Sequence, residues 1–483
     1  MKKYITILSI TISCVLFTSC DDYLNENPDD RQEVKTLENI QELLVSGYSE
    51  ASYNFIEWQT DNVVAIPDNT QFPEMTETFQ FIPVVSSEQQ DTPTYFWTLT
   101  YTAIAHANQA LEEMSKITIS NKDIVKADAI KGEAYLVRAY NHFLLANIFC
   151  QTYDETTAGT NLGVPYILAP ETNLLVSYER GTLKETYDKI EDDLEKGLVL
   201  LNNDFYKGSG KYHFNLNAAY AFASRFYLYK SDYENCIKYS NKILGNNTAT
   251  TTYIKDMDAV FKGTSLAGIS AQFIDVNSPT NFLVVRKEST YVRANRGYRS
   301  NSSIFAQLYT NNIQGGVDNR DLRYQYGGTE SRYQPKYAEL FRYTTSTTGF
   351  PYYIQPELRS EETIFNRMES FVKRGNISQA LADYNVFAKL RYENGGQLTL
   401  NKITDYYSDA ATEEEAMMAF IISERRKEFL GEGLRWWDIK RFNIAVTHVD
   451  VTGQTFTLEK VDPKKAVQIP LGAIASGIEA NPR

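Results

Sequence analysis

Cysteine is scarce in this chain, with four residues among 483. Cys14 and Cys20 lie near the N-terminus, so only Cys150 and Cys236 remain for the folded part. Two cysteines do not make a disulfide framework, and neither has the neighbouring thiols of a zinc site. Both lie in apolar segments with helical spacing, where cysteine behaves as a small buried hydrophobe. We therefore exclude a disulfide scaffold and a cysteine-based metal site.

Sequence signatures of enzymes are also missing. The four histidines are scattered singly, and neither G-x-S-x-G nor H-E-x-x-H occurs. The segment 208–211 is similar to a phosphate-binding loop, but Phe205 replaces its first glycine and Tyr212 replaces its Ser or Thr. We predict a protein that is not an enzyme and holds no cofactor and no metal. A carboxylate pair that no motif marks leaves a hydrolase as an alternative.

Basic residues are fewer than acidic residues. Lys and Arg number 48 against 61 Asp and Glu, so the formal net charge is −13. No run of basic residues is typical of a nucleic-acid surface. We therefore expect no nucleic-acid partner.

Long hydrophobic runs are limited to residues 5–17, which follow a short basic start. This run is too short to span a bilayer as a stable anchor. It ends in LFTSC at residues 16–20, which resembles a lipoprotein signal box. We expect removal of residues 1–19 and acylation of Cys20, which would anchor the protein to a membrane. The acidic residues 20–35 then form a tether, and this sequence alone leaves open which membrane carries it.

Helical periodicity is the most frequent pattern in the chain. Apolar residues recur at helical spacing over 36–53, 95–116, 126–149 and 180–202, with Thr182 as N-cap of the last. The segment 54–90 lacks this periodicity and contains Trp58, Asp61 and Asn62. A connection of this length is often functional. We take these three residues as candidate ligand contacts.

Two later segments, 218–244 and 371–391, carry the same pattern of helix, turn and helix. Ser231 corresponds to Gly375, Tyr233 to Ile377 and Cys236 to Ala380, at one offset of 144 residues. Each copy is similar to one tetratricopeptide unit, although tandem units of that kind repeat about every 34 residues. We predict a mainly α-helical protein with interrupted tetratricopeptide-like helix pairs and an irregular, loop-rich second lobe.

That second lobe is expected over residues 250–360, where helical periodicity fades and tyrosine alternates with arginine. A sugar ring has an apolar face that packs on aromatic rings and a rim of hydroxyls that binds polar side chains. An irregular surface with ordinary tyrosines is the alternative interpretation. The candidate ligand contacts in the lobe are Tyr291, Arg296, Tyr298, Tyr324 and Tyr326.

Residues 424–442, ERRKEFLGEGLRWWDIKRF, concentrate charge around two tryptophans. A helix is expected over 413–428, and it places Glu424 and Glu428 on the same face as two apolar residues. Unpaired buried carboxylates are costly, so we expect cationic partners. A structural ion-pair role for Glu424, Glu428 and Arg435 is the main interpretation, and a glycosidase-like carboxylate pair is the alternative. The expected partners within the segment are Arg425, Arg426, Arg435, Lys440 and Arg441.

The pattern E-R-R-x-E-F-x-x-E-G-x-R-W-x-D-I-x-R in this segment resembles the C-terminal signature of the SusD/RagB family. Residues 97–111, 126–149 and 180–202, and the closing Ile-Pro and Asn-Pro at 469–482, are similar to further family motifs. The resemblance implies a SusD-like fold with a signal peptide at 1–19, a tether at 20–35, helical regions at 36–249 and 361–483, and a ligand lobe at 250–360.

The same resemblance implies a function. The protein is then an outer-membrane lipoprotein that faces the cell exterior, binds an oligosaccharide and delivers it to a SusC-like TonB-dependent transporter. A lid of the same type for peptides or other nutrients is an alternative, as is a purely interaction-type scaffold. The family motifs do not extend into the loops, so the candidate ligand residues rest on their chemistry alone.

Overall fold

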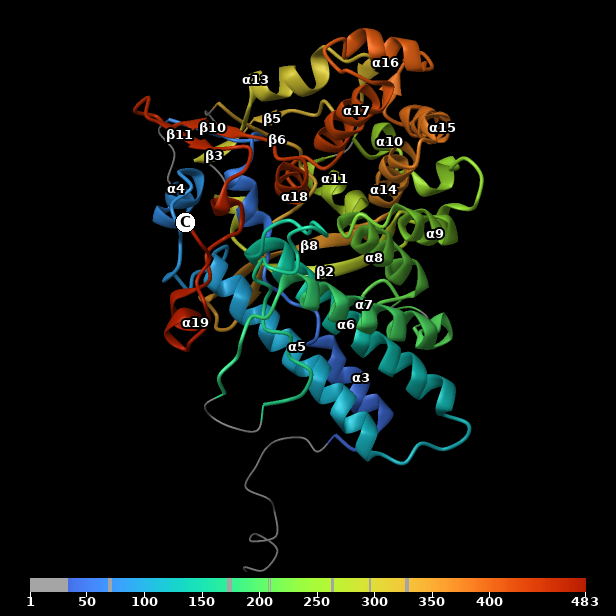
Figure 1. Ribbon diagram of the computed structural model, residues 1–483, viewed down its shortest axis with the longest axis vertical. Coiled ribbons are helices and arrows are strands. Elements are labelled where there is room, and N and C mark those ends of the chain that lie inside the picture. Colours follow the sequence, from blue (N-terminus) through green and yellow to red (C-terminus); the bar gives the residue numbers. More distant parts are fainter. Residues whose placement is uncertain are drawn as a thin grey trace, which may run out of the picture.

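The structure is a computed structural model that describes residues 34–67, 72–171, 176–206, 208, 210–261, 265–294, 297–325 and 330–483 (Figure 1). The leader, Cys20 and most of the tether lie outside the described residues, as do Arg296 and Tyr326. The protein is mainly α-helical, as predicted, and its described strands form four small antiparallel sheets.

Four helices from the first half of the chain lie side by side in the lower part of Figure 1. They are α3 (Leu37–Val45), α5 (Pro93–Lys116), α6 (Ile124–Phe149) and α7 (Leu183–Leu200). The helix expected over 36–53 ends at Val45. The chain then turns at Gly47, which packs closely on α6: a Cβ there would lie 2.9 Å from the Val137 side chain. α6 packs between α5 and α7, which explains why it is buried on nearly every side.

The start of α7 forms as the sequence predicts. The Thr182 side chain accepts a hydrogen bond from the Glu185 backbone N–H, and the Glu185 side chain accepts one from the Thr182 backbone N–H. Further along, Arg138 of α6 binds both oxygens of Asp193 at 2.7 Å. This buried pair joins α6 to α7.

The two predicted helix pairs are present at the predicted offset. α8 (Leu216–Tyr229) and α9 (Tyr233–Leu244) are matched by α14 (Ser360–Lys373) and α15 (Ile377–Ala388). Both pairs turn through a left-handed residue, Ser231 at φ 64° and Gly375 at φ 75°. α14 packs against both α8 and α9, so the second pair folds back onto the first.

The last helices complete the upper part of the molecule in Figure 1: α16 (Leu400–Tyr406), α17 (Glu413–Glu428) and α18 (Leu434–Arg441). α17 has the predicted bounds. Gly431 and Gly433 between α17 and α18 have φ of 76° and 78°, a conformation that glycine adopts without strain. The expected helical break therefore forms at these two residues.

The region 250–360 contains more regular structure than expected. A three-stranded sheet in the order β2-β8-β7 runs through the centre of the molecule. Its strands are β2 (Asn281–Glu288), β8 (Gly349–Arg359) and β7 (Leu340–Tyr343). The apolar run 282–285 within β2 is typical of a buried strand. β8 is buried along its second half, so no alternation of apolar and polar residues marks it.

A second sheet joins the first loop, residues 54–90, to the 250–360 region. Its strands are β1 (Val64–Ala65), β3 (Tyr298–Asn301), β6 (Ser331–Tyr333) and β5 (Tyr324–Gln325), in that order. Val64 pairs with Arg299 and Ala65 with Tyr298. Strands of two to four residues leave no periodic pattern, so this contact was not predicted.

The remaining described elements are short. They are η1 (Asn54–Gln59), α4 (Pro73–Phe79), η2 (Asn203–Phe205), η3 (Thr251–Tyr253), α10 (Met257–Phe261), α11 (Leu266–Phe273), α12 (Tyr291–Ala294), α13 (Ser302–Phe305), η4 (Ala306–Thr310), β4 (Val317–Asp318), β9 (Tyr392–Glu393), β10 (Val446–Val449), β11 (Thr455–Leu458), η5 (Pro463–Lys465) and α19 (Leu471–Ala475).

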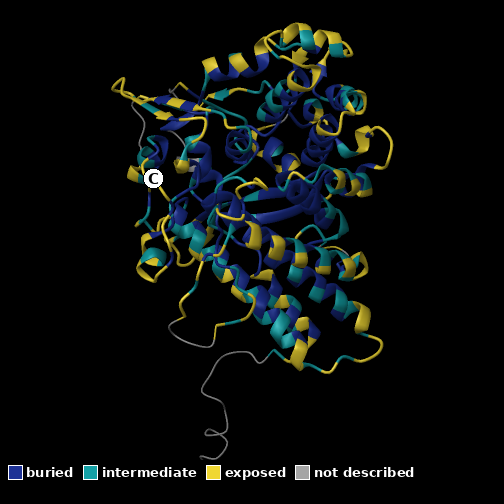
Figure 2. Ribbon diagram, in the orientation of Figure 1, coloured by how far each residue is buried: buried dark blue, intermediate teal, exposed yellow. Residues whose placement is uncertain are grey.

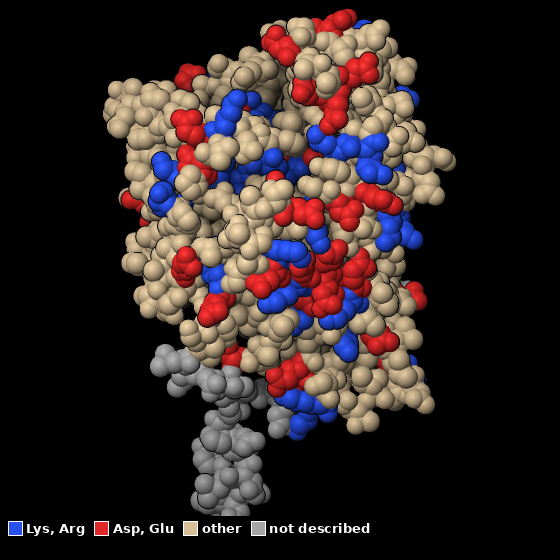
Figure 3. Space-filling model, in the orientation of Figure 1, with Lys and Arg blue, Asp and Glu red and all other residues tan. Residues whose placement is uncertain are grey.

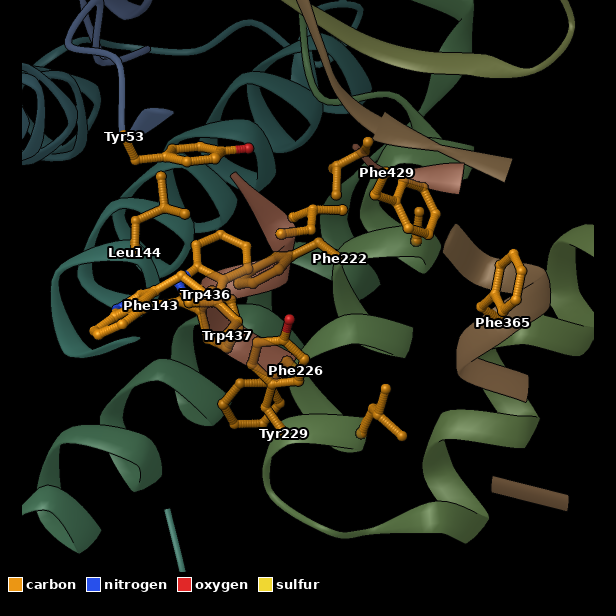
Figure 4. Packing of buried hydrophobic residues seen from close by; sticks show 14 of the residues in the cluster. Tyr53, Phe143, Leu144, Phe222, Phe226, Tyr229, Phe365, Phe429, Trp436 and Trp437 are labelled. Atoms are coloured by element: carbon orange, nitrogen blue, oxygen red, sulfur yellow. The ribbon is translucent and has the colours of Figure 1, made fainter. Parts of the chain in front are cut away.

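The main hydrophobic core runs through the middle of the molecule, with exposed residues at its edges (Figure 2), and three smaller clusters lie apart from it. Trp436 and Trp437 of α18 pack in it beside Phe143, Phe222 and Tyr229 (Figure 4). The same core includes residues of β2 and β8. The 250–360 region thus shares its core with the helices, and its status as a separate lobe stays a prediction. Among the described helices, none has the length and apolar character needed to cross a membrane.

Candidate functional site

Glu424 and Glu428 on α17 are buried, with exposed fractions of 1% and 3%. Glu424 accepts a hydrogen bond from Lys427 at 2.6 Å and one from Arg320 at 2.8 Å. Burial alone would raise the pKa of this carboxyl, but Lys427 and Arg320 lower it to about 2. Glu428 is held by Arg391, which keeps its pKa well below the usual range against the effect of burial. Both carboxylates are therefore ionised and bound to cations.

The cations that bind these two carboxylates are not the expected ones. Arg320 and Arg391 come from outside residues 424–442, and Lys427 was not among the candidates. Of the expected partners, Arg425 binds Asp438 at 3.1 Å and Arg441 binds Glu369 at 2.7 Å. These arginines lie on other faces of their helices. The five expected residues were therefore the wrong partners for the two carboxylates, although one partner, Lys427, does lie within the segment.

Arg435 connects α18 to the first loop. Its Nε and Nη2 each donate a hydrogen bond of 2.8 Å to the carboxylate of Asp61. Arg426 donates through Nε to the Asn62 side chain at 2.8 Å, and Asn62 donates to Glu57 at 2.8 Å. Asp61 and Asn62, predicted as ligand contacts, are thus bonded to protein groups here, and a ligand role for them stays a prediction.

The predicted aromatic contacts of the first loop and β3 are packed inside the protein. Trp58 and Tyr298 have exposed fractions of 2% and 1%. The ring of Tyr298 stacks on Phe79 at 4.3 Å, and Trp58 lies 6.3 Å from the ring of Tyr291. In this conformation these rings stabilise the contact between the first loop and the 250–360 region.

Tyr324 lies closer to the surface. It is partly exposed on β5, and its ring is 6.3 Å from that of Tyr333 on β6. The guanidinium of Arg299 lies 4.7 Å from the centre of the Tyr333 ring. Aromatic and cationic side chains therefore lie close together here, although Arg299 itself is buried, and a ligand surface in this region stays a prediction. The predicted Arg296 and Tyr326 are outside the described residues.

A cavity of about 50 Å³ lies where the first loop, the 250–360 region and the α17–α18 turn meet. Arg299, Arg332 and Tyr333 contribute to its wall, as do Tyr291 and Gly431. A cavity of this volume has room for water but not for a sugar ring. Only single groups of a larger ligand would fit inside it.

Three residues of the cavity wall have a buried oxygen without a hydrogen-bond donor among the residues that the structure describes. These atoms are Glu57 Oε2, Gln334 Oε1 and the Tyr337 hydroxyl. Burial raises the pKa of Glu57. Unsatisfied buried polar atoms are costly, and water or ligand hydroxyls would satisfy them. The sequence did not single out these residues, because an isolated Glu, Gln or Tyr carries no motif.

Metal and thiol chemistry finds no support in the described part of the chain. No group of three or more His, Cys, Asp or Glu side chains in it is suited to hold a metal ion. Cys150 and Cys236 are free and buried, as the sequence predicted.

The chain matches two sequence families. Residues 22–228 match a family described as "Starch-binding associating with outer membrane", and residues 396–468 match one described as "SusD family". Together these matches cover more than half of the chain and lie on either side of the 250–360 region. The chain belongs to the SusD family.

Known SusD-like proteins are similar to this chain over most of its length. "SusD-like protein P38" of Formosa agariphila is 23% identical over 92% of this chain and 93% of its own length. A solved SusD superfamily protein from Bacteroides thetaiotaomicron has the same fold, with a TM-score of 0.68, 18% identity and coverage of 93% of this chain and 100% of the other. A structure titled as a SusD-like carbohydrate binding protein, from Bacteroides vulgatus, has a TM-score of 0.60 at 19% identity, covering 91% and 94%.

The SusD-family matches leave residues 229–395 unmatched. Tyr291, Tyr298, Tyr324 and most of the cavity wall lie in this unmatched part. The family matches therefore assign no role to the residues that line the cavity.

Proposed function

We propose that this SusD-family protein binds a glycan at the cell surface and passes it to a SusC-like TonB-dependent transporter, without catalysing a reaction. The family match and the carbohydrate-binding relative in Bacteroides vulgatus support the ligand class. The division into a signal peptide, a tether, two helical regions and a ligand region is part of the same proposal.

The observation that carries the proposal is the pairing of β1 with β3, which brings the first loop against the 250–360 region. The pairing places Tyr333, Arg299 and Arg332 around a cavity with unsatisfied oxygens. Tyr333 offers an aromatic face for the apolar side of a sugar ring. Glu57 and Gln334 offer acceptors for its hydroxyls. This combination suits a hydroxyl-rich ligand.

A glycan panel on the mature chain with Cys20→Ala tests the ligand class. We expect retention of at least one oligosaccharide, with no release of new reducing ends. Tyr333→Ala should weaken that binding about tenfold, since stacking on one aromatic ring contributes roughly 1–2 kcal/mol. Tyr343→Ala is the matched control, because Tyr343 is 68% exposed on β7 and does not line the cavity. No retention of any glycan, or equal loss in both variants, would contradict the proposal.

The membrane anchor has its own test. In cells, the wild-type chain should fractionate with the outer membrane and incorporate a labelled fatty acid, whereas Cys20→Ala should lose both properties. Co-purification of a TonB-dependent transporter with the wild-type chain tests the proposed partner. A wild-type chain that stays soluble and unlabelled would contradict the lipoprotein assignment.

A further inference from the structure

A second hollow, of about 320 Å³, lies between η4 on one side and α17 and α18 on the other. It shares no lining residue with the cavity described above. Figure 3 shows the molecule hollowed between α13 and α17, with a band of Lys and Arg side chains at the level of α18. The volume is at the lower end of the range for small-molecule sites and suits one sugar unit.

The wall of this hollow is cationic. Arg426, Lys427 and Arg435 line it, with Glu424 as its acidic residue. Glu424 is already occupied, since it accepts from Lys427, Arg320 and the Tyr392 hydroxyl. The charge of Glu424 is therefore neutralised within the protein. Arg426 and Arg435 are the cations of the wall that Glu424 does not bind.

Arg426 and Arg435 share a single carboxylate. The Nη1 of Arg426 lies 3.2 Å from an Asp61 oxygen, and Arg435 binds both Asp61 oxygens. The pKa of Arg426 is lowered by burial and, despite the attraction of Asp61, by Arg435. Both guanidinium groups line the hollow and bind Asp61, and Arg435 is also attracted by Asp438 and Glu57.

Arg435 has one donor left over. Its side chain is buried, with an exposed fraction of 6%, and its Nε and Nη2 are used by Asp61. Its Nη1 is buried and has no acceptor among the residues that the structure describes. A buried charged donor without an acceptor is strongly disfavoured. Because Arg435 lines the hollow, an acceptor from a ligand that came within reach of this nitrogen would remove this cost.

The rim of the hollow offers contacts for a sugar. Tyr406 is 54% exposed and its ring lies 5.0 Å from that of Tyr407. Gln307 and Asn311 are exposed beside it and carry amide groups. A sugar ring can lie on Tyr406 and bind these amides while a charged substituent points inward.

We propose that this hollow is a subsite for an acidic sugar unit, one that carries a carboxylate or a sulfate group. The inference rests on the proposed glycan-binding function and specifies the chemistry of the glycan. The donors of Arg435 and Arg426 bind the anionic oxygens, because a planar guanidinium matches both groups. Tyr406 holds the ring of the same unit. A neutral unit would leave the Arg435 Nη1 without an anionic partner.

The test measures binding of three oligosaccharides of equal length and linkage: one neutral, one with uronic acids and one sulfated. We expect one acidic form to bind at least tenfold more tightly than the neutral form at low salt, with the preference falling as salt rises. Arg435→Lys keeps a charge for Asp61 but removes Nη1, and should abolish the preference for the acidic form. Arg323→Lys, on an exposed arginine paired with Asp321, is the matched control.

Sodium acetate and sodium sulfate serve as competitors. If the subsite binds a carboxylate or a sulfate, the matching salt should weaken binding of the acidic oligosaccharide beyond the effect of sodium chloride at equal ionic strength. Tyr406→Ala should weaken acidic binding at least fivefold. Tyr406 is exposed, so this variant keeps the test decisive even if Arg435→Lys does not fold.

The outcomes separate the two proposals. No binding of any saccharide overturns the proposed function. Binding of a neutral saccharide with no acidic preference, or an acidic preference that survives both Arg435→Lys and Tyr406→Ala, leaves the proposed function standing and overturns this subsite.

Discussion

Arg391 binds Glu428 through two hydrogen bonds, from Nε at 2.7 Å and from Nη2 at 2.9 Å, across 37 residues of sequence. Both side chains are at most 2% exposed. The Nη1 of Arg359 lies 3.7 Å from Oε1 of the same carboxylate. This pairing connects the end of α15 to α17 in the interior, where the loss of one partner leaves a buried charge unbalanced.

We expect Glu428→Ala to lower the free energy of unfolding by about 3–5 kcal/mol, because Arg391 would stay buried without its partner. Chemical denaturation monitored by circular dichroism measures the change. Glu459→Ala is the control, since Glu459 is exposed and its loss should change stability by less than about 0.5 kcal/mol. Equal effects of the two substitutions would rule out a structural role for Glu428.

The lowered pKa of Glu424 predicts a specific acid sensitivity. Its pKa is about 2 in the folded protein against 4.5 ordinarily, so the unfolded chain binds the proton first as pH falls. The stability from this group is complete above pH 4.5 and is lost between pH 4.5 and 2, by about 3 kcal/mol. The difference in stability between wild type and Glu424→Gln should therefore shrink across this window. A constant difference would contradict the pairing with Lys427 and Arg320.

Ser231 and Gly375 occupy equivalent left-handed turns in the two helix pairs. Ser231→Gly should raise the free energy of unfolding by about 0.5–1 kcal/mol, because glycine adopts positive φ without steric cost. Gly375→Ser should lower it by a similar amount. Thermal unfolding of both variants measures the two shifts. Shifts of the same sign would show that the two turns are not equivalent.

Gly197 allows α7 to approach α6 closely. A Cβ at this position would lie 2.6 Å from the Leu136 side chain and 2.9 Å from the carbonyl oxygen of Gly132. Gly197→Ala should therefore lower the free energy of unfolding by about 1–3 kcal/mol, despite the better helix propensity of alanine. Gly472→Ala in α19, where a Cβ would meet nothing within 4 Å, should be neutral or slightly stabilising. Stabilisation by both substitutions would refute the close contact.

Lys440 of α18 is buried against the C-terminal end of α6. Its Nζ donates to the carbonyl oxygens of Asn147 and Cys150 at 2.5 and 2.8 Å. Burial lowers its pKa to about 7; the nearby Cys150 thiol acts against this and Lys465 adds to it. Between pH 7 and 9 the unfolded chain then binds more protons, so stability rises with pH by about 1 kcal/mol per unit.

The comparison of wild type with Lys440→Met isolates this effect. The stability of wild type relative to the variant should increase from pH 7 to 9, as measured by denaturation at each pH. Lys460→Met, at an exposed position, should show no such trend. A difference that does not change with pH would mean that Lys440 stays charged in the folded protein.

Much of the fold followed from local patterns in the sequence. The helix over Glu413–Glu428 formed with the predicted bounds, and the two helix pairs repeat at an offset of 144 residues. Helical periodicity, N-caps and the Gly431–Gly433 break act within a few residues, so sequence alone can show them. The motifs also indicated the family that the sequence comparisons then matched.

The sequence predicted the candidate site only in part. The sequence indicated that tyrosine and arginine side chains gather in the 250–360 region, and Tyr324, Arg299 and Tyr333 lie close together there. It did not indicate Glu57, Gln334 or Tyr337, whose unsatisfied oxygens border the cavity. Whether a polar side chain lacks a partner depends on all of its neighbours, and these come from distant parts of the chain.

The sequence by itself determined which segments are helical, where the helix pairs turn, and that Glu424 and Glu428 share one helix face. Only the tertiary structure decided their partners, because Arg320 and Arg391 lie 104 and 37 residues away. It also decided that Arg435 meets Asp61 across 374 residues and that β1 pairs with β3. Helix formation depends on neighbours along the chain, whereas these pairings depend on how the helices pack, and no local pattern encodes that.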